Sequence, residues 1–184
     1  MYRLCLSVLF FVASTMGAFG DKLEITIKGE GANGIVVIDL LEEIAPLHVE
    51  RMLALASNGN YDGIVFHRVI EGFMAQTGDV QFGKLGDDIE NAGRGGSSMP
   101  DLVAEFSNIP FDRGVVGMAR AQNPNSANSQ FFIMFNKGYF LNGQYTVVGK
   151  VLEGIDVVDT IKLGLGPNGA VLGAPEFMEK VRPQ

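Results

Sequence analysis

Short apolar stretches separated by turn residues dominate the chain from residue 23 onward, and their spacing is that of strands. Residues 23–27 alternate between apolar and polar side chains, and residues 35–41 are apolar apart from one aspartate. An Asn-Gly pair between them is a strong hairpin signal. Further short strands are expected at four other stretches, residues 114–120, 130–135, 145–151 and 176–181. The pattern therefore predicts a mainly β protein.

Two segments have helical spacing instead. Pro46 can occupy a first helical turn and Gly59 can cap the end, so a helix is predicted over residues 46–58. A shorter helix is predicted over residues 154–163, which Gly164 would end. Many short strands with two helices favour a closed antiparallel barrel, because helices can plug its ends. The pattern alone leaves a β-sandwich almost equally open.

An arginine lies at an unusual place in this pattern. A turn separates two predicted strands, residues 66–70 and 73–78, and alternation puts Arg68 on the same face as Phe66 and Ile70. Such an arginine either extends its guanidinium to water from a strand end or serves as a fixed donor at the rim of an apolar groove. The spacing alone favours the first interpretation.

The first twenty residues have the layout of a cleaved secretory signal peptide. Arg3 precedes an apolar run over residues 4–13, and small residues stand before Asp21. The run is too short to cross a bilayer core, which needs about 20 residues, so no stable membrane anchor is expected. We expect a signal peptide at residues 1–20, one domain at residues 21–184, and action in the periplasm or another secretory compartment.

Charge and composition narrow the classes of partner. The chain has 14 basic and 21 acidic side chains, a net charge of −7, and loss of Arg3 with the signal peptide makes it −8. An acidic surface disfavours nonspecific binding to nucleic acid or anionic lipid. Cys5 is the only cysteine and would be removed with the signal peptide, so the mature domain would contain no thiol.

Other candidate chemistry is weak. Residues 164–169 read GLGPNG and match a dinucleotide fingerprint by letter, but they follow a predicted helix rather than a strand, so they are expected to form a loop. The two histidines offer little material for a metal site or a catalytic triad. We expect His48 to be solvated on its helix and His67 to be a hydrogen-bonded barrel residue. No metal or cofactor is expected.

Three blocks of sequence resemble those of the cyclophilins, the cyclosporin-sensitive class of peptidyl-prolyl isomerases. They are FHRVIEGFMAQTGD at residues 66–79, MAR with NSQFFI at residues 118–120 and 128–133, and FLNGQYTVVGKV at residues 140–151. The resemblance extends over about residues 23–181. It implies an eight-stranded antiparallel closed barrel capped by two α-helices, packed solid with side chains, with the substrate groove on the outside.

The resemblance also implies a site. Arg68 matches the catalytic arginine of the family. The walls of the proline pocket are matched by Phe73, Met74, Phe132 and Leu141, and polar groups that hold the arginine and the substrate backbone are matched by Gln76 and Gln130. Ala119 and Arg120 fall where the family offers backbone groups to the residue before proline. Phe131 and Ile133, which alternate with Phe132, are expected to be ordinary core.

Three positions depart from the pattern of the family. Arg120 stands where many members have asparagine, and it adds a positive charge to the groove. Phe140 replaces the tryptophan of cyclosporin-sensitive members, so we expect weak cyclosporin binding with isomerase activity retained. Tyr145 replaces the usual pocket histidine and keeps an aromatic wall with a polar tip, which would shift the substrate preference.

The sequence thus predicts an exported monomeric isomerase that acts on X–Pro bonds in polypeptides and assists protein folding. Two alternatives stay open. One is a cyclophilin-like module that binds proline-containing segments without catalysis, although a pure binder has no need of Arg68. The other is a carrier of small ligands, which would require a hollow apolar interior.

Overall fold

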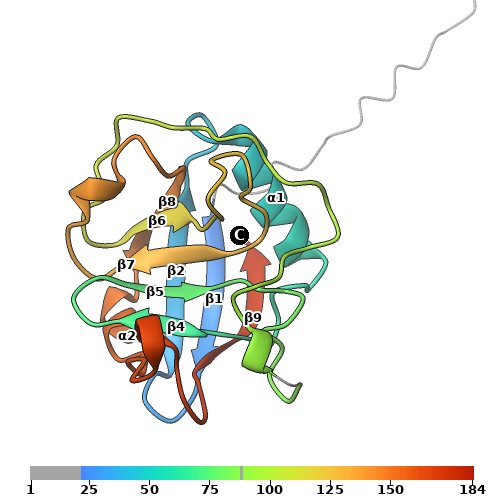
Figure 1. The fold of residues 1–184 in the computed structure, drawn as a ribbon, viewed down its shortest axis with the longest axis vertical. Coiled ribbons are helices and arrows are strands. Elements are labelled where there is room, and N and C mark those ends of the chain that lie inside the picture. Colours follow the sequence, from blue (N-terminus) through green and yellow to red (C-terminus); the bar gives the residue numbers. More distant parts are fainter. Residues whose placement is uncertain (1–21, 88) are drawn as a thin grey trace, which may run out of the picture.

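The structure, a computed structural model, describes residues 22–87 and 89–184. The signal peptide predicted at residues 1–20 lies outside the described residues and stays a prediction. The described residues form nine strands and two α-helices, whose arrangement Figure 1 shows. They are β1 (Lys22–Lys28), β2 (Gly34–Leu40), α1 (Pro46–Ser57), β3 (Ile64–Val65), β4 (Arg68–Ile70), β5 (Met74–Thr77), β6 (Val115–Met118), β7 (Phe131–Met134), β8 (Val147–Glu153), α2 (Ile155–Asp159) and β9 (Phe177–Pro183). Three short 3₁₀ turns are η1 (Ile89–Asn91), η2 (Tyr139–Leu141) and η3 (Pro167–Gly169).

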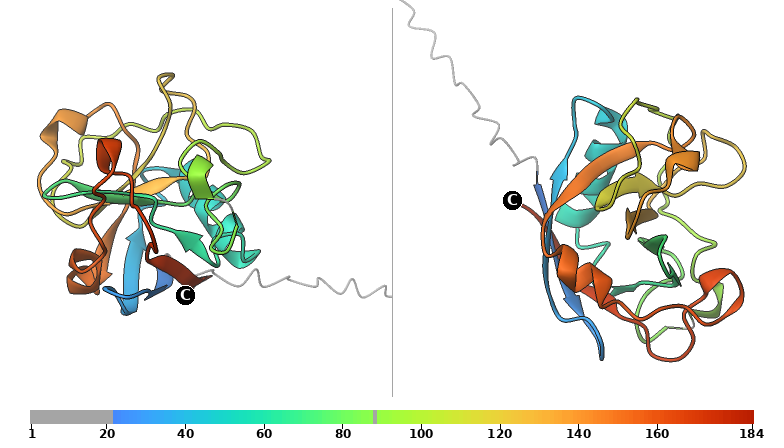
Figure 2. Two further views of the ribbon diagram at one scale, coloured as in Figure 1. Left: turned by 60° about the horizontal axis from the view of Figure 1, so that its bottom comes forward. Right: turned by 90° about the vertical axis from the view of Figure 1, so that its left-hand side faces the viewer.

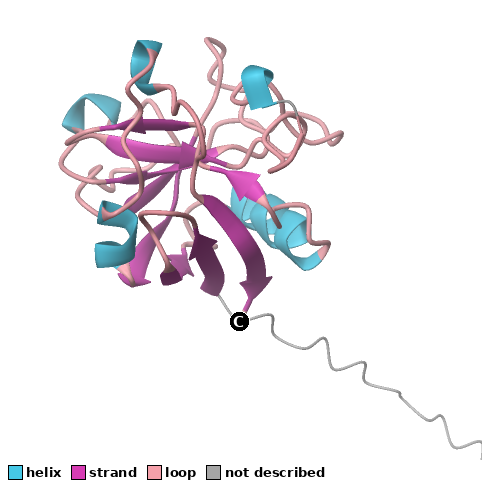
Figure 3. Cartoon of the chain, turned by 90° about the horizontal axis from the view of Figure 1, so that it is seen from below, coloured by secondary structure: helices cyan, strands magenta, loops and turns pink. Residues whose placement is uncertain are grey.

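All nine strands belong to one antiparallel sheet in the order β3-β9-β1-β2-β8-β6-β7-β5-β4. The sheet curls, so that β1 and β2 lie on one side of the interior while β5 and β6 lie on the other (Figure 2). Helix α1 packs against β9 and α2 packs against β2, and Figure 3 shows the helices outside the curled sheet. The mainly β fold with two helices is as predicted.

The prediction of a closed eight-stranded barrel is wrong in strand number and in closure. The sheet begins at β3 and ends at β4, which are consecutive along the chain but do not pair with each other. Between them, the N–H of Phe66 donates to the carbonyl of Glu176 and the carbonyl of His67 accepts from Val171. Phe66 thus extends the register of β3 on β9, whereas His67 bonds to the C-terminal loop, so no ladder joins β3 to β4 and the curled sheet stays open.

The same interruption breaks the predicted alternation across residues 66–70. Phe66 is fully buried in the main core, whereas Ile70 packs with a second apolar cluster beside Phe132. The two side chains therefore do not share a face, because they belong to separate segments on either side of the break. Arg68 and Ile70 do alternate with the buried Val69 within β4.

The local predictions agree well with the structure elsewhere. Helix α1 begins at Pro46 and ends one residue before the predicted boundary, and Gly59 has a φ of 70°, as expected after a helix end. Helix α2 is shorter than predicted and covers only Ile155–Asp159. The first two strands form a hairpin, as predicted. Its connection is residues 29–33 rather than the Asn-Gly pair, since Gly34 already belongs to β2 and pairs with Ile27.

The interior is filled by apolar side chains of the sheet and of α1, including Ile25, Ile38, Met52, Phe131 and Ile133. Phe131 and Ile133 are fully buried there, as predicted. Phe132 points to the opposite face of β7 and belongs to the second cluster, with Met74 and Leu141. A filled interior does not suit the carrier alternative, and it places the candidate site on the outer face.

Candidate active site

The register of the sheet brings the central site residues into one row. Arg68 of β4 pairs with Gln76 of β5, Gln76 pairs with Phe132 of β7, and Phe132 pairs with Gly117 of β6. Paired residues on adjacent strands point to the same face. Four strands therefore present an arginine, a glutamine, an aromatic ring and a glycine side by side on the outer face of the sheet.

The Arg68 guanidinium is held from two sides. Its Nη1 donates to Oε1 of Gln76 at 3.0 Å and lies 4.0 Å from the sulfur of Met74. On the other side, Nε donates to the carbonyl of Asn168 at 3.0 Å and Nη2 donates to Oδ1 of Asn168 at 3.1 Å. Partial burial lowers the pKa of Arg68, and the nearby Tyr145 opposes this shift. Arginine nevertheless stays protonated in proteins, so the guanidinium is a fixed cationic donor.

A chain of hydrogen bonds continues from Arg68 through two glutamines. Nε2 of Gln76 donates to Oε1 of Gln130 at 2.9 Å, and Nε2 of Gln130 donates to the carbonyl of Gly95 at 2.8 Å. Gly95 in turn donates its N–H to the buried carboxylate of Asp79 at 2.9 Å. Each glutamine thus has its amide orientation fixed by a partner on both sides, which holds Arg68 in one position.

Beside the guanidinium lies a pocket of about 250 Å³. Its floor and walls are apolar and largely buried, since Met74, Phe132 and Leu141 are 1%, 4% and 6% exposed. The pocket brings together every predicted site residue except Gln130, namely Arg68, Phe73, Met74, Gln76, Ala119, Arg120, Phe132, Phe140, Leu141 and Tyr145. A small, mostly apolar ring would fit there, and a polar atom at the edge of that ring could face Arg68.

Aromatic contacts fix the shape of this pocket. The ring of Phe132 stacks on Phe111 at 5.8 Å between centroids and meets the edge of Tyr145 at 6.0 Å. A Cβ on Gly117 would lie 2.6 Å from both Phe111 and Phe132, so only glycine leaves room for these rings. At the rim, Phe140 packs on Phe73 at 5.4 Å but is 66% exposed. The pocket is rigid at its base and open at Phe140.

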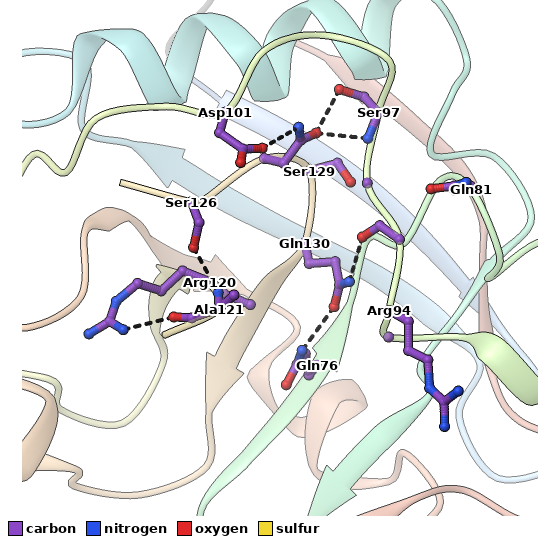
Figure 4. Close-up of a pocket in the computed structure, with 15 residues that line it drawn as sticks. Gln76, Gln81, Arg94, Ser97, Asp101, Arg120, Ala121, Ser126, Ser129 and Gln130 are labelled. Carbon is purple, nitrogen blue, oxygen red and sulfur yellow. Dashed lines mark hydrogen bonds between the residues drawn. The ribbon is translucent and has the colours of Figure 1, made fainter. Parts of the chain in front are cut away.

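A second, polar pocket of about 510 Å³ adjoins the first (Figure 4). The two share Gln76, Ala119 and Arg120, and Gln130 lies in the wall of the polar pocket. The guanidinium carbon of Arg120 is 4.3 Å from the centre of the Tyr145 ring, which suits a cation–π contact. Two of the positions that depart from the family pattern are therefore in contact with each other.

Asn168 contacts Arg68 but was not among the site residues that the sequence predicted. It lies in the GLGPNG stretch, which forms a loop with a short 3₁₀ turn, as predicted. Asn168 has a φ of 55°. Among the residues that the structure describes, no other residue except glycine has a positive φ. Asparagine tolerates this conformation better than most residues, but nothing in the sequence pairs it with an arginine 100 positions away.

The prediction that His48 is solvated is wrong. His48 is fully buried, and its Nδ1 lies 2.5 Å from Oε2 of Glu105, whose carboxylate also accepts from the first amides of α1. His67 is largely buried, and neither of its ring nitrogens has a hydrogen-bond partner of good geometry among the described residues. The pKa of His67 is lowered to about 4, mainly by burial; Asp79 opposes this shift, the charge of Arg68 adds to it, and the neighbouring Gln130 side chain and Val65 backbone also oppose it.

Residues 22–87 and 89–184 contain neither a cluster of metal-binding side chains nor a helix able to span a membrane. No group of three or more histidine, cysteine, aspartate or glutamate side chains there is arranged to hold a metal ion. No helix in that part of the chain has the length and apolar character needed to cross a membrane.

The chain resembles curated proteins over most of its length. It is 54% identical over 176 residues to a probable peptidyl-prolyl cis-trans isomerase of Brucella suis biovar 1, covering 92% of this chain and 90% of that protein. It is 41% identical over 130 residues to the peptidyl-prolyl cis-trans isomerase-like 3 of Gallus gallus, covering 70% of this chain and 76% of the relative.

Solved structures agree with these relatives. A cyclophilin type peptidyl-prolyl cis-trans isomerase of Cryptosporidium parvum, solved in the presence of the dipeptide Ala-Pro, superposes with a TM-score of 0.73 at 25% identity, covering 89% of this chain and 98% of that one. The cyclophilin AquaCyp293 of Hirschia baltica gives a TM-score of 0.70 at 25% identity, covering 88% and 73%. Residues 22–175 match the family described as cyclophilin type peptidyl-prolyl cis-trans isomerase/CLD. This chain therefore belongs to the cyclophilin-type peptidyl-prolyl cis–trans isomerase family.

Proposed function

We propose that this protein catalyses cis–trans isomerisation of X–Pro bonds in polypeptides, with Arg68 as its catalytic residue, and thereby assists protein folding. The main support is the position of the Arg68 guanidinium. Its hydrogen bonds to Gln76 and Asn168 hold it at the edge of an apolar pocket. Phe73, Met74, Phe132 and Leu141 would contact the proline ring. Ala119, Arg120 and Gln130 would face the substrate backbone.

The geometry suits the chemical requirement. The barrier to rotation about a peptide bond is about 18–20 kcal/mol and arises from amide resonance. A hydrogen bond from a cation to the prolyl nitrogen localises its lone pair, which lowers the energy of the twisted state. A turnover of order 10³ s⁻¹ requires about 5.5–7 kcal/mol of such stabilisation. No nucleophile or proton transfer is needed, and Arg68 is already oriented by two neighbours.

The decisive test is the exchange rate between cis and trans forms of an Ala-Pro peptide, measured by NMR. We expect the protein to accelerate exchange and the Arg68→Ala variant to lose most of that acceleration while staying folded by circular dichroism. Arg113→Ala removes an exposed arginine outside both pockets and serves as the matched control. Binding of the peptide without acceleration would favour the non-catalytic binding module instead.

We also propose that cyclosporin binds weakly. Phe140, exposed at the rim, packs on Phe73 and has no N–H group to donate to the drug. Calorimetry should show weaker binding for the protein than for its Phe140→Trp variant, and equal affinities would contradict this.

We further propose that the protein is exported and acts in the periplasm or another secretory compartment. The support is the sequence pattern of residues 1–20. Mass spectrometry of the protein recovered from its native host should give a chain that begins at Asp21. Recovery of a full-length chain from the cytoplasm would contradict export.

A further inference from the structure

Three arginines line the two adjoining pockets. Arg68 and Arg120 line the apolar pocket, and Arg120 and Arg94 line the polar one. Among the residues that the structure describes, none of the three lies within ion-pair distance of a carboxylate, since the arginine–carboxylate pairs found there involve Arg113 and Arg182. The whole chain has a net charge of −7. The two pockets together form a groove, and this groove is a local concentration of positive charge on an acidic protein.

Neutral groups fix the Arg120 guanidinium. Its nitrogens donate to the carbonyls of Ala121, Gln122 and Gln144 at 2.9–3.3 Å, and its plane faces the Tyr145 ring. Carbonyl oxygens and an aromatic face orient a cation without cancelling its charge. Arg120 thus keeps a full positive charge at the junction of the two pockets.

Arg94 lies on a loop that hydrogen bonds to Asp79 and Gln130 hold in place. The N–H groups of Gly93 and Gly95 donate to Oδ2 of Asp79 at 2.7 and 2.9 Å, and the carbonyl of Gly95 accepts from Gln130. The Arg94 side chain donates to the neutral amide of Asn91 at 3.2 Å. Its position on the pocket wall is therefore tied to the Gln130 amide, while its charge stays available.

The carboxylate that lines the polar pocket lies away from these cations. Figure 4 shows Arg120 and Arg94 on opposite sides of the Gln76–Gln130 pair, with Asp101 at the other end of the pocket. Oδ1 of Asp101 accepts from the Asn128 amide at 3.0 Å. The end of the polar pocket nearest the proline pocket is consequently the positive end.

A substrate would bring its preceding residue to this end. The prolyl nitrogen must face Arg68, and the residue before proline is attached to that nitrogen. Gln76 is bonded to Arg68 and forms part of the wall that the two pockets share. The side chain of the preceding residue therefore starts beside Gln76 and Arg120.

We propose that this groove selects X–Pro bonds that are preceded by an acidic residue, with Arg120 as the main specificity-determining residue and Arg94 as a second. The proposal rests on the proposed function and names its substrate class. The attraction would be electrostatic, because both arginines line the polar pocket, and the carboxylate among its lining residues, Asp101, lies at its other end.

The test uses four peptides that differ only in Glu, Gln, Ala or Lys before proline, with kcat/KM measured by NMR exchange. For partly exposed charges we expect Glu to exceed Gln by about two- to five-fold at low ionic strength. The ratio should approach one in 1 M salt, where the screening length falls to about 3 Å. Lys should be a poorer substrate than Ala.

Matched variants identify the source of the preference. Arg120→Gln and Arg94→Gln should each lower the Glu/Gln ratio, Arg120→Lys should keep most of it, and Arg113→Gln, the same charge change outside the pockets, should leave it unchanged. A ratio of one in the unmodified protein, or a ratio that neither groove variant lowers, overturns the proposal. If the Ala-Pro peptide is accelerated but the ratio is one, only this preference fails. If no peptide is accelerated, the proposed function fails with it.

Discussion

At the scale of single residues, the proposed active site depends on how one guanidinium is oriented. Gln76 holds Arg68 from within the sheet, and Asn168 holds it from a loop through two bonds, one to its carbonyl and one to its side chain. A flexible arginine would sample many rotamers and lose much of its value as a directed donor. If Arg68 is the catalytic residue, as we propose, Asn168 is a positioning residue that acts through it.

The change Asn168→Gly isolates the side-chain bond. Glycine accepts the φ of 55° without strain and keeps the carbonyl bond to Nε, but it removes Oδ1. We expect kcat on an Ala-Pro peptide to fall about three- to ten-fold, the equivalent of one hydrogen bond, while KM and the free energy of unfolding change little. Single-temperature NMR exchange at several peptide concentrations separates kcat from KM.

A double variant provides the control. In the Arg68→Ala background, Asn168→Gly should have no further effect on kcat, because the group that it orients is gone. Equal losses in both backgrounds would show that Asn168 supports the fold rather than the arginine.

The candidate-site residues that the sequence predicted lie close together in its motifs, and the structure gathers them in one row or pocket, whereas those contributed by distant loops were missed. Arg68, Gln76 and Phe132 belong to recognisable blocks, and the sheet places them in one row. Asn168 and Arg94 reach the site from loops whose paths depend on long-range hydrogen bonds, such as those to Asp79. No local pattern encodes such contacts.

At the scale of elements, the apolar pocket depends on the close approach of β6 and β7. Gly117 of β6 lies opposite Phe132 of β7. Because Gly117 has no side chain, the rings of Phe132 and Phe111 can occupy the space beside its Cα. The sequence predicted both strands but not how they pair. Only their pairing shows that a glycine is required at position 117. The break at residues 66–67 was likewise invisible, because the C-terminal loop imposes it.

We expect Gly117→Ala to distort the pocket from beneath. The added methyl group would lie 2.6 Å from both rings, so Phe132 must shift. The free energy of unfolding should fall by about 1–3 kcal/mol, typical of overpacking, and KM for an Ala-Pro peptide should rise. Urea unfolding and NMR exchange measure the two effects. Adding Phe111→Leu should recover part of both losses, and a failure of this rescue would mean that the cause is the backbone and not the rings.

At the scale of the whole molecule, His67 links stability to pH. Its pKa is lowered to about 4 in the folded state by burial, against about 6.5 in an unfolded chain. Between these values the unfolded state binds more protons, so the free energy of unfolding should decrease as the pH falls from 6.5 to 4 and level off below it. The full effect is at most about 3 kcal/mol.

Urea unfolding at several pH values would test this, with His67→Gln as the comparison. The variant should show a shallower decrease between pH 6.5 and 4, whatever its stability at neutral pH. Identical slopes for the two proteins would show that His67 becomes protonated as easily in the folded state as in the unfolded one.

The coverage of β4 decides how a polypeptide can bind. β4 ends the sheet, but its outward groups are occupied, since the carbonyls of His67 and Val69 accept from Val171 and Gly164. An incoming chain therefore cannot extend the sheet there as a tenth strand. A ladder of that kind would hold a substrate in one extended form, whereas binding at the proposed site on the outer face would leave the X–Pro torsion free to turn while the chain stays bound.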